Sequence, residues 1–205
     1  MEILKKTAVF FMLIGLQSTY GQDQKTLLDA FTKSYSLETT FKYSEAIETL
    51  KSLNTTDNYP VALRLGWLSN LAKKYDESAA YYRKASDLMP VSVEALLGLV
   101  NPLANQKKWT EVEQVYLDIL KIEPKNSTVN FRLGQIYYNR KEYSKAEKYF
   151  STALNLYPFD YDSMLMSAWN YYFLGNYNEA KALFNRVLLY SPKDASAKEG
   201  LGMIK

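Results

Sequence analysis

Cysteine and histidine are both absent from the 205 residues of this chain. Their absence excludes disulfides, thiolate nucleophiles, Ser-His-Asp and Cys-His catalytic pairs, and zinc sites built from these ligands. It also excludes a lipid anchor attached through a cysteine. The remaining chemical options are carboxylate pairs, lysine or tyrosine chemistry, and hard cations bound through oxygen. Because the acidic clusters of the chain are better interpreted as solvated surface than as a cation site, we expect no cofactor and no metal site.

The chain also lacks a concentrated basic segment. Lys and Arg number 25 against 22 Asp and Glu, and the formal net charge is +3. Nucleic-acid binding needs positive charge gathered on one face, so we expect no nucleic-acid partner. Acidic pairs such as Asp76-Glu77 fall on predicted turns and exposed helix faces. We interpret them as solvated surface, so we expect no catalytic residues and no enzyme.

The N-terminus differs in character from the rest of the chain. Lys5 and Lys6 precede an apolar run over residues 7–16, which is followed by small residues at Thr19 and Gly21. This order is typical of a secretory signal peptide over residues 1–21. An uncleaved anchor is the alternative, although the run is about half the ~20 residues that span a bilayer. We expect an exported, periplasmic or secreted protein without stable membrane insertion after cleavage.

Residues of the same type recur along the chain at intervals of 34 positions. The prolines are Pro90, Pro124, Pro158 and Pro192, one aromatic series is Tyr75, Trp109, Tyr143 and Tyr177, and another is Tyr82, Tyr116, Phe150 and Phe184. Each unit carries two apolar stripes at helical spacing, and its proline ends the second helix. The pattern predicts a repeated pair of amphipathic helices.

Small side chains allow two such helices to pack closely. Gly134 is such a position, and we expect a large side chain such as Tyr137 to fill the space beside it. Pro102 lies inside a predicted first helix, where a missing N–H predicts a kink or a break.

This pattern resembles the tetratricopeptide repeat, a 34-residue helix–turn–helix unit. In one unit the resemblance is carried by Leu133, Gly134, Tyr137, Tyr143, Ala146, Phe150, Ala153 and Pro158. It implies an all-α fold, a right-handed superhelical array of repeats called an α-solenoid. The implied parts are a degenerate first repeat over 22–58, repeats over 59–92, 93–126 (divergent), 127–160 and 161–194, and a C-terminal capping helix over 195–205.

In tetratricopeptide arrays the first helix of each pair lines a concave groove, so the resemblance implies a partner-binding surface there. The implied groove residues are Leu63, Trp67, Asn70, Leu71, Leu97, Asn101, Asn105, Phe131, Gln135, Tyr138, Asn139, Leu165, Trp169, Tyr172 and Phe173. The set contains no Lys or Arg, so a carboxylate clamp is not expected. Its aromatic side chains favour a protein or peptide segment as the partner.

The expected function is a non-catalytic scaffold in an envelope assembly or secretion complex. Two alternatives remain open. Aromatic residues at helical spacing are more often core residues, so those of the groove could pack against the capping segment or a second copy. The chain could also be a self-assembling structural subunit that associates through an exposed face of the C-terminal helix around Leu201 and Ile204.

Overall fold

The computed structural model describes residues 24–53 and 57–204, so the predicted signal peptide lies outside the described residues. Residues 24–39 are helical. The helices that follow are α2 (Tyr43–Lys51), α3 (Tyr59–Leu71), α4 (Tyr75–Leu88), α5 (Val93–Asn105), α6 (Trp109–Ile122), α7 (Ser127–Asn139), α8 (Tyr143–Leu156), α9 (Tyr161–Leu174), α10 (Tyr177–Tyr190) and α11 (Ala195–Met203). The described residues contain no strand, and the predicted all-α array of helix pairs is confirmed.

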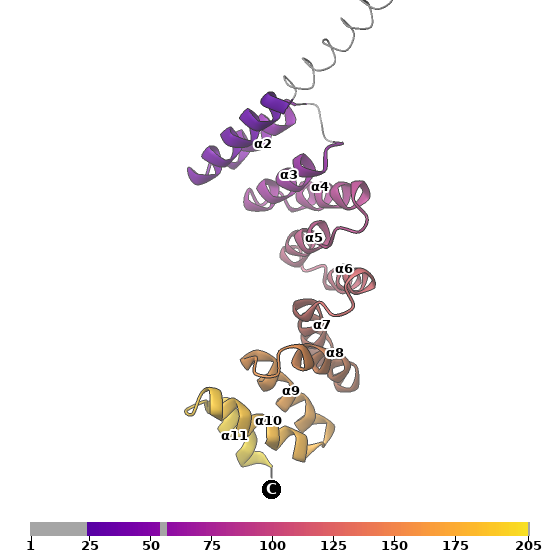
Figure 1. Ribbon diagram of the computed structural model, residues 1–205, viewed down its shortest axis with the longest axis vertical. Coiled ribbons are helices and arrows are strands. Elements are labelled where there is room, and N and C mark those ends of the chain that lie inside the picture. The colour runs from indigo at the N-terminus through magenta and orange to yellow at the C-terminus, as the bar shows by residue number, and fades with distance from the viewer. Residues whose placement is uncertain (1–23, 54–56, 205) are drawn as a thin grey trace, which may run out of the picture. The chain divides into compact units, whose positions relative to one another are not determined.

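The described residues divide into two compact units, the first ending at Gln106 and the second beginning at Lys107. The N-terminal unit contains the helix over 24–39 and α2 to α5, and the C-terminal unit contains α6 to α11. Within each unit a helix packs mainly on its neighbours in sequence, as α3, α4 and α5 do in Figure 1. Contacts limited to neighbours are the defining property of a repeat architecture.

The first helices of successive pairs begin at regular intervals. The helices α3, α5, α7, α9 and α11 begin at Tyr59, Val93, Ser127, Tyr161 and Ala195, which places each start 34 residues after the one before it. Before four of these starts, an Asn or Asp side chain accepts a hydrogen bond from the backbone N–H three residues further on, which satisfies a free donor of the first turn. These capping residues are Asn58, Asn126, Asp160 and Asp194.

The turn between the two helices of a pair has the same backbone geometry in both units. One residue is left-handed, with φ of 59° at Phe41, 60° at Lys73, 61° at Lys141 and 79° at Gly175. Its own N–H and the next N–H bond back to the last turn of the preceding helix, as in Gly175 to the Tyr172 carbonyl and Asn176 to the Tyr171 carbonyl. This pair of bonds is the Schellman motif, which satisfies carbonyls that a helix end leaves free.

Gly175 gives a direct test of that turn. Replacing Gly175 with alanine is expected to destabilise the C-terminal unit by about 1 kcal/mol, because a Cβ is unfavourable at positive φ. The added methyl meets no atom within 4 Å, so the cost comes from the backbone alone. The matched control is Gly202→Ala, which also has open space around it but lies in α11. This control is expected to be neutral or stabilising by up to about 1 kcal/mol. Equal stabilities of the two variants in urea denaturation would contradict the turn geometry.

Aromatic rings of the second helices lie against glycines of the first helices. A Cβ on Gly66 would lie 3.0 Å from the Tyr82 ring, and a Cβ on Gly98 of α5 would lie 2.1 Å from it. The same relation joins Gly134 to Phe150, at 2.5 Å. The prediction that Tyr137 fills the space beside Gly134 is therefore wrong. The ring of Tyr137 instead stacks on Tyr149, with centroids 5.4 Å apart.

The helix α5 runs without a break from Val93 to Asn105, although Pro102 lies inside it. The predicted break therefore does not occur. Pro102 falls in the last turn of the helix. Its missing N–H removes one backbone hydrogen bond there, close to the end of the helix, so the helix continues to Asn105.

Candidate functional site

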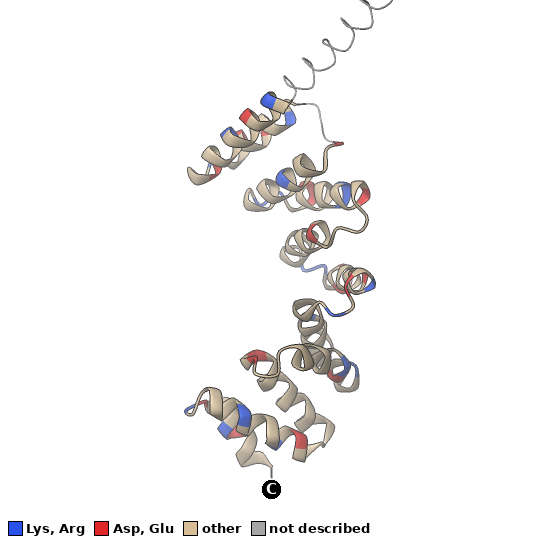
Figure 2. Cartoon of the chain, viewed as in Figure 1, with Lys and Arg blue, Asp and Glu red and all other residues tan. Residues whose placement is uncertain are grey.

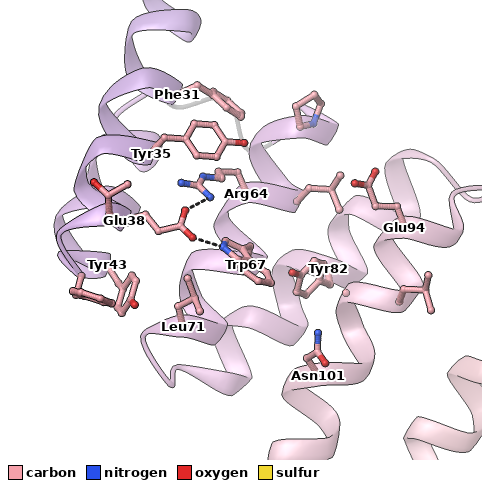
Figure 3. Close-up of a pocket in the computed structure, with 16 residues that line it drawn as sticks. Phe31, Tyr35, Glu38, Tyr43, Arg64, Trp67, Leu71, Tyr82, Glu94 and Asn101 are labelled. Atoms are coloured by element: carbon pink, nitrogen blue, oxygen red, sulfur yellow. Dashed lines mark hydrogen bonds and ion pairs between the residues drawn. The ribbon is translucent and has the colours of Figure 1, made fainter. Parts of the chain in front are cut away.

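The N-terminal unit contains an open groove of about 1060 Å³ between the helix over 24–39, α3 and α5. Figure 3 shows its lining side chains, with Arg64, Trp67 and Leu71 on α3 and Glu94 and Asn101 on α5. Aromatic rings contribute much of the lining. They are Phe31, Tyr35, Phe41, Tyr43, Trp67 and Tyr82.

The sequence-predicted residues of this unit divide into two groups. Those that line the groove are Leu63, Trp67, Leu71, Leu97 and Asn101. Asn70 and Asn105 are not among the lining residues. The Asn105 side chain donates to the carbonyl of Asn101 one turn earlier, at 3.0 Å, and the Asn70 side chain is partly buried.

The structure adds lining residues that the sequence analysis did not include. Phe31, Tyr35 and Glu38 come from the helix over 24–39, and Arg64 comes from α3. The prediction that the groove has no Lys or Arg is therefore wrong, because Arg64 is part of its wall. The first repeat is too degenerate for its residues to be assigned from the repeat pattern. Arg64 lies between the positions that the family pattern assigns to the groove.

Arg64 is the centre of a polar network on the groove wall, although its side chain is only 7% exposed. Its Nη1 lies 2.5 Å from Glu38 Oε2, and its Nε donates to Ser34 Oγ at 3.1 Å. Trp67 Nε1 donates to the other carboxylate oxygen of Glu38 at 2.8 Å, as Figure 3 shows. The charge of the guanidinium is therefore balanced inside the protein, which a cation so far removed from water requires.

Tyr35 covers the guanidinium of Arg64. The Cζ atom lies 3.8 Å from the centroid of the Tyr35 ring, a cation–π arrangement. Arg64 Nη2 is buried and finds no hydrogen-bond acceptor among the described residues. Tyr35 itself is 54% exposed, so its outer face is open to solvent.

Glu94 supplies the acidic side of the groove, on α5. It accepts a hydrogen bond from the Tyr59 hydroxyl at 3.2 Å, and that hydroxyl also lies 2.5 Å from Ser92 Oγ. Burial raises the pKa of Tyr82 to about 12, and the charge of Glu94 acts in the same direction. Tyr82 therefore stays neutral near pH 7 and adds no charge to the groove.

In the C-terminal unit, the predicted groove aromatics mainly contact one another. Trp169 lies 6.2 Å from Phe173 and 5.7 Å from Tyr172, measured between ring centroids. Tyr138 lies 5.9 Å from Phe173. Trp169 Nε1 also donates to Ser196 Oγ of α11 at 2.8 Å. For Trp169 the structure therefore favours the alternative in which a groove aromatic packs against the capping segment.

The remaining predicted residues of this unit have varied surroundings. Phe131 packs on Phe150, with centroids 5.8 Å apart, and Leu165 is partly buried against the core of the unit. Gln135 accepts from Arg132 Nη1 at 2.9 Å, and Asn139 is exposed at the end of α7. These four residues do not converge on a shared polar network comparable to the one around Arg64.

The helices α6 and α7 of this unit are joined by a partly buried acid. Glu113 accepts hydrogen bonds from the Tyr137 hydroxyl and from Arg140 Nη1, both at 2.6 Å. Burial acts to raise the pKa of Glu113, but these bonds and nearby positive charges outweigh it and hold the pKa below its ordinary value. The lowered pKa of Glu113 is thus explained by a structural ion pair with Arg140 and the hydrogen bond from Tyr137.

The predicted self-assembly face of the C-terminal helix was defined by Leu201 and Ile204. Leu201 and Ile204 are partly buried and pack on the core of the C-terminal unit. The exposed residues of α11 include Lys198, Glu199 and Gly202, and also Met203, which is 49% exposed.

Within residues 24–53 and 57–204, no group of three or more acidic side chains is arranged to hold a metal ion. In the same part of the chain, none of the helices has both the length and the apolar character to cross a membrane.

Comparison with known proteins identifies the repeats. Two family models, both described as tetratricopeptide repeat, match residues 127–160 and 162–194. No curated protein matches the chain. A tetratricopeptide repeat protein from Parabacteroides merdae ATCC 43184 is similar in structure, with 20% identity, a TM-score of 0.72, and coverage of 88% of this chain and 72% of that one.

Structures of MamA are similar as well. MamA AMB-1 is 22% identical with a TM-score of 0.67, over 82% of this chain and 93% of that one. Another MamA crystal structure is 17% identical with a TM-score of 0.70, over 84% of this chain and 95% of that one. At these identities the likeness shows the fold.

Proposed function

Since this chain belongs to the tetratricopeptide repeat family, we propose that it is a non-catalytic scaffold that binds a segment of a partner protein. The observation that carries the proposal is the groove of about 1060 Å³ in the N-terminal unit. Repeat arrays use such surfaces for binding. Its aromatic lining is of the kind enriched at binding hot spots.

The position of Trp67 makes it the main contact residue of the proposed site. Its side chain is 41% exposed on the groove wall, and its indole N–H is held by Glu38. A fixed aromatic ring loses little conformational entropy when a partner covers it. The aromatics of the C-terminal unit already contact one another, so we assign them a packing role and place recognition in the N-terminal groove.

Two features support a protein partner over a nucleic acid. Figure 2 shows Lys and Arg spread over helices of both units, among Asp and Glu. The groove wall contains two carboxylates and one guanidinium, a balance that does not suit a phosphate backbone. We further propose, from the apolar run over residues 7–16, that the protein is exported and works in an envelope assembly or secretion complex.

The proposal is tested by capturing partners from the host's envelope fraction with wild-type protein and with Trp67→Ala. The truncation removes a hot-spot contact, so recovery of the partner is expected to fall about tenfold or more. Trp109→Ala is the matched control, because Trp109 is 53% exposed and does not line the groove. It should capture as well as wild type.

Trp67→Ala also removes a hydrogen bond to Glu38, so a second variant is needed. Leu97→Ser changes the groove wall from α5 without touching that network. Circular dichroism checks that each variant is folded. If folded Trp67→Ala and Leu97→Ser both retain the partner at the wild-type level, the groove is not the binding site.

A further inference from the structure

The groove of the N-terminal unit has only one basic residue among its lining residues, and the charge of that residue is already used. Arg64 is paired with Glu38 at 2.5 Å, is bonded to Ser34, and lies beneath the Tyr35 ring. Its Nη2 has no acceptor among the described residues, but this atom is buried and not open to a partner. A partner carboxylate at this wall would face Glu38 and would gain little from a guanidinium that is already neutralised. The wall therefore disfavours an acidic segment.

Among the charged residues that line the groove, Glu94 is the one outside the ion pair of Arg64 and Glu38. It is exposed on α5, its one described bond is the hydrogen bond from Tyr59, and no Lys or Arg of the described residues forms an ion pair with it. With two carboxylates against one guanidinium, the lining carries a net charge of one negative. The neighbouring tyrosines do not change this charge, because burial raises the pKa values of both Tyr59 and Tyr82.

The rest of the groove lining is largely apolar and aromatic. Leu63, Trp67 and Leu97 line the same groove, as do the exposed rings of Tyr35 and Phe41. Aromatic faces attract cations through their quadrupole, and the attraction adds to that of a nearby carboxylate. An aromatic groove with one unpaired acid thus complements a Lys or Arg side chain set among apolar residues.

We infer that the groove selects an apolar segment that carries at least one Lys or Arg, with the cation at Glu94 and the apolar side chains against Trp67 and Leu97. The inference rests on the proposed function, because it names the chemistry of the segment that the same groove binds. It is the opposite of a clamp for acidic or C-terminal carboxylate groups. Glu94 is the residue that sets this specificity.

The test uses a library of random peptides displayed on phage, selected on the wild-type chain and on Trp67→Ala. Peptides that bind the wild type but not the variant are groove binders. Among them, Lys and Arg are expected to outnumber Asp and Glu. If Asp and Glu are as frequent or more so, the inference fails and the proposed function stands. If no peptide depends on Trp67, the groove does not hold a segment and the proposed function fails.

A second measurement assigns the preference to Glu94. For a selected peptide, replacing its basic residue by glutamine is expected to weaken binding about tenfold, the combined size of an exposed ion pair and a cation–π contact. Glu94→Gln should weaken the original peptide about three- to fivefold and should leave the glutamine peptide unchanged. Glu199→Gln removes the same charge from an exposed position on α11, outside the groove, and should not change the affinity for either peptide. Equal effects of Glu94→Gln on both peptides would overturn the assignment.

Discussion

Replacing Glu38 with glutamine is expected to destabilise the N-terminal unit by about 3 kcal/mol, the low end for breaking a buried ion pair. Arg64 would remain with its side chain 93% removed from solvent and without its counter-charge. In wild type, Arg64 Nη1 and Trp67 Nε1 each donate to one oxygen of Glu38. Glutamine replaces one of these oxygens by an NH2 group, which is itself a donor, so one of the two donors loses its acceptor. The measurement is urea denaturation followed by circular dichroism.

Two further variants separate charge from packing in that result. Glu45→Gln breaks an exposed ion pair with Lys42 in the same unit and should cost less than about 1 kcal/mol. The double variant Arg64→Met with Glu38→Met replaces both charges by apolar groups and should lie within about 1–2 kcal/mol of wild type. If the double variant is less stable than Glu38→Gln, the two side chains contribute by packing and the ion pair is not the cause.

Replacing Phe184 with alanine is expected to cost the C-terminal unit about 3–5 kcal/mol, the range for removing a buried aromatic ring. Phe184 has no exposed surface, and its ring lies where a Cβ on Gly200 would approach to 2.2 Å. It also meets Trp169 edge to face, with centroids 5.1 Å apart. Because the same ring contacts α9 and α11, its loss should loosen α11 first.

Hydrogen exchange measures that local effect. Amides of α11 (Ala195–Met203) are expected to lose protection in Phe184→Ala before those of α7 and α8 do. Leu189→Ala is the control, because Leu189 is in the same helix and is 75% exposed. Its cost should stay below about 1 kcal/mol. If Phe184→Ala is as stable as Leu189→Ala, the packing described for the Phe184 ring is contradicted.

Much of the fold could be predicted because the same residue pattern recurs in several repeats. The proline series predicts where the second helices end, and Phe150 and Phe184 of one aromatic series are buried, whereas Trp109 and Tyr177 of the other are exposed. The ring that meets Gly134 was assigned wrongly, to Tyr137 instead of Phe150. Periodicity identifies the apolar stripe of each helix, but it does not determine which of two large residues occupies a given gap.

The candidate site could be predicted less completely, and the reason is specific to Arg64. Carrying groove positions over from a repeat pattern gives the same positions in every unit. It cannot show that a guanidinium is drawn to the wall by Ser34 and Glu38, which belong to a helix without a recognisable repeat pattern. Trp169 was assigned to the groove, but its indole N–H donates to Ser196 of α11. A single repeat does not contain both residues, so the repeat pattern could not predict this contact.

The hydrogen bond from Trp67 Nε1 to Glu38 has an optical consequence. The chain has three tryptophans, and Trp67 is the one of them on the groove wall. An indole that is 41% exposed and hydrogen-bonded to a carboxylate emits fluorescence at long wavelength, and it shifts toward the blue when an apolar surface displaces water from it. With Trp109 and Trp169 replaced by phenylalanine, the protein would carry its own unlabelled sensor of groove occupancy.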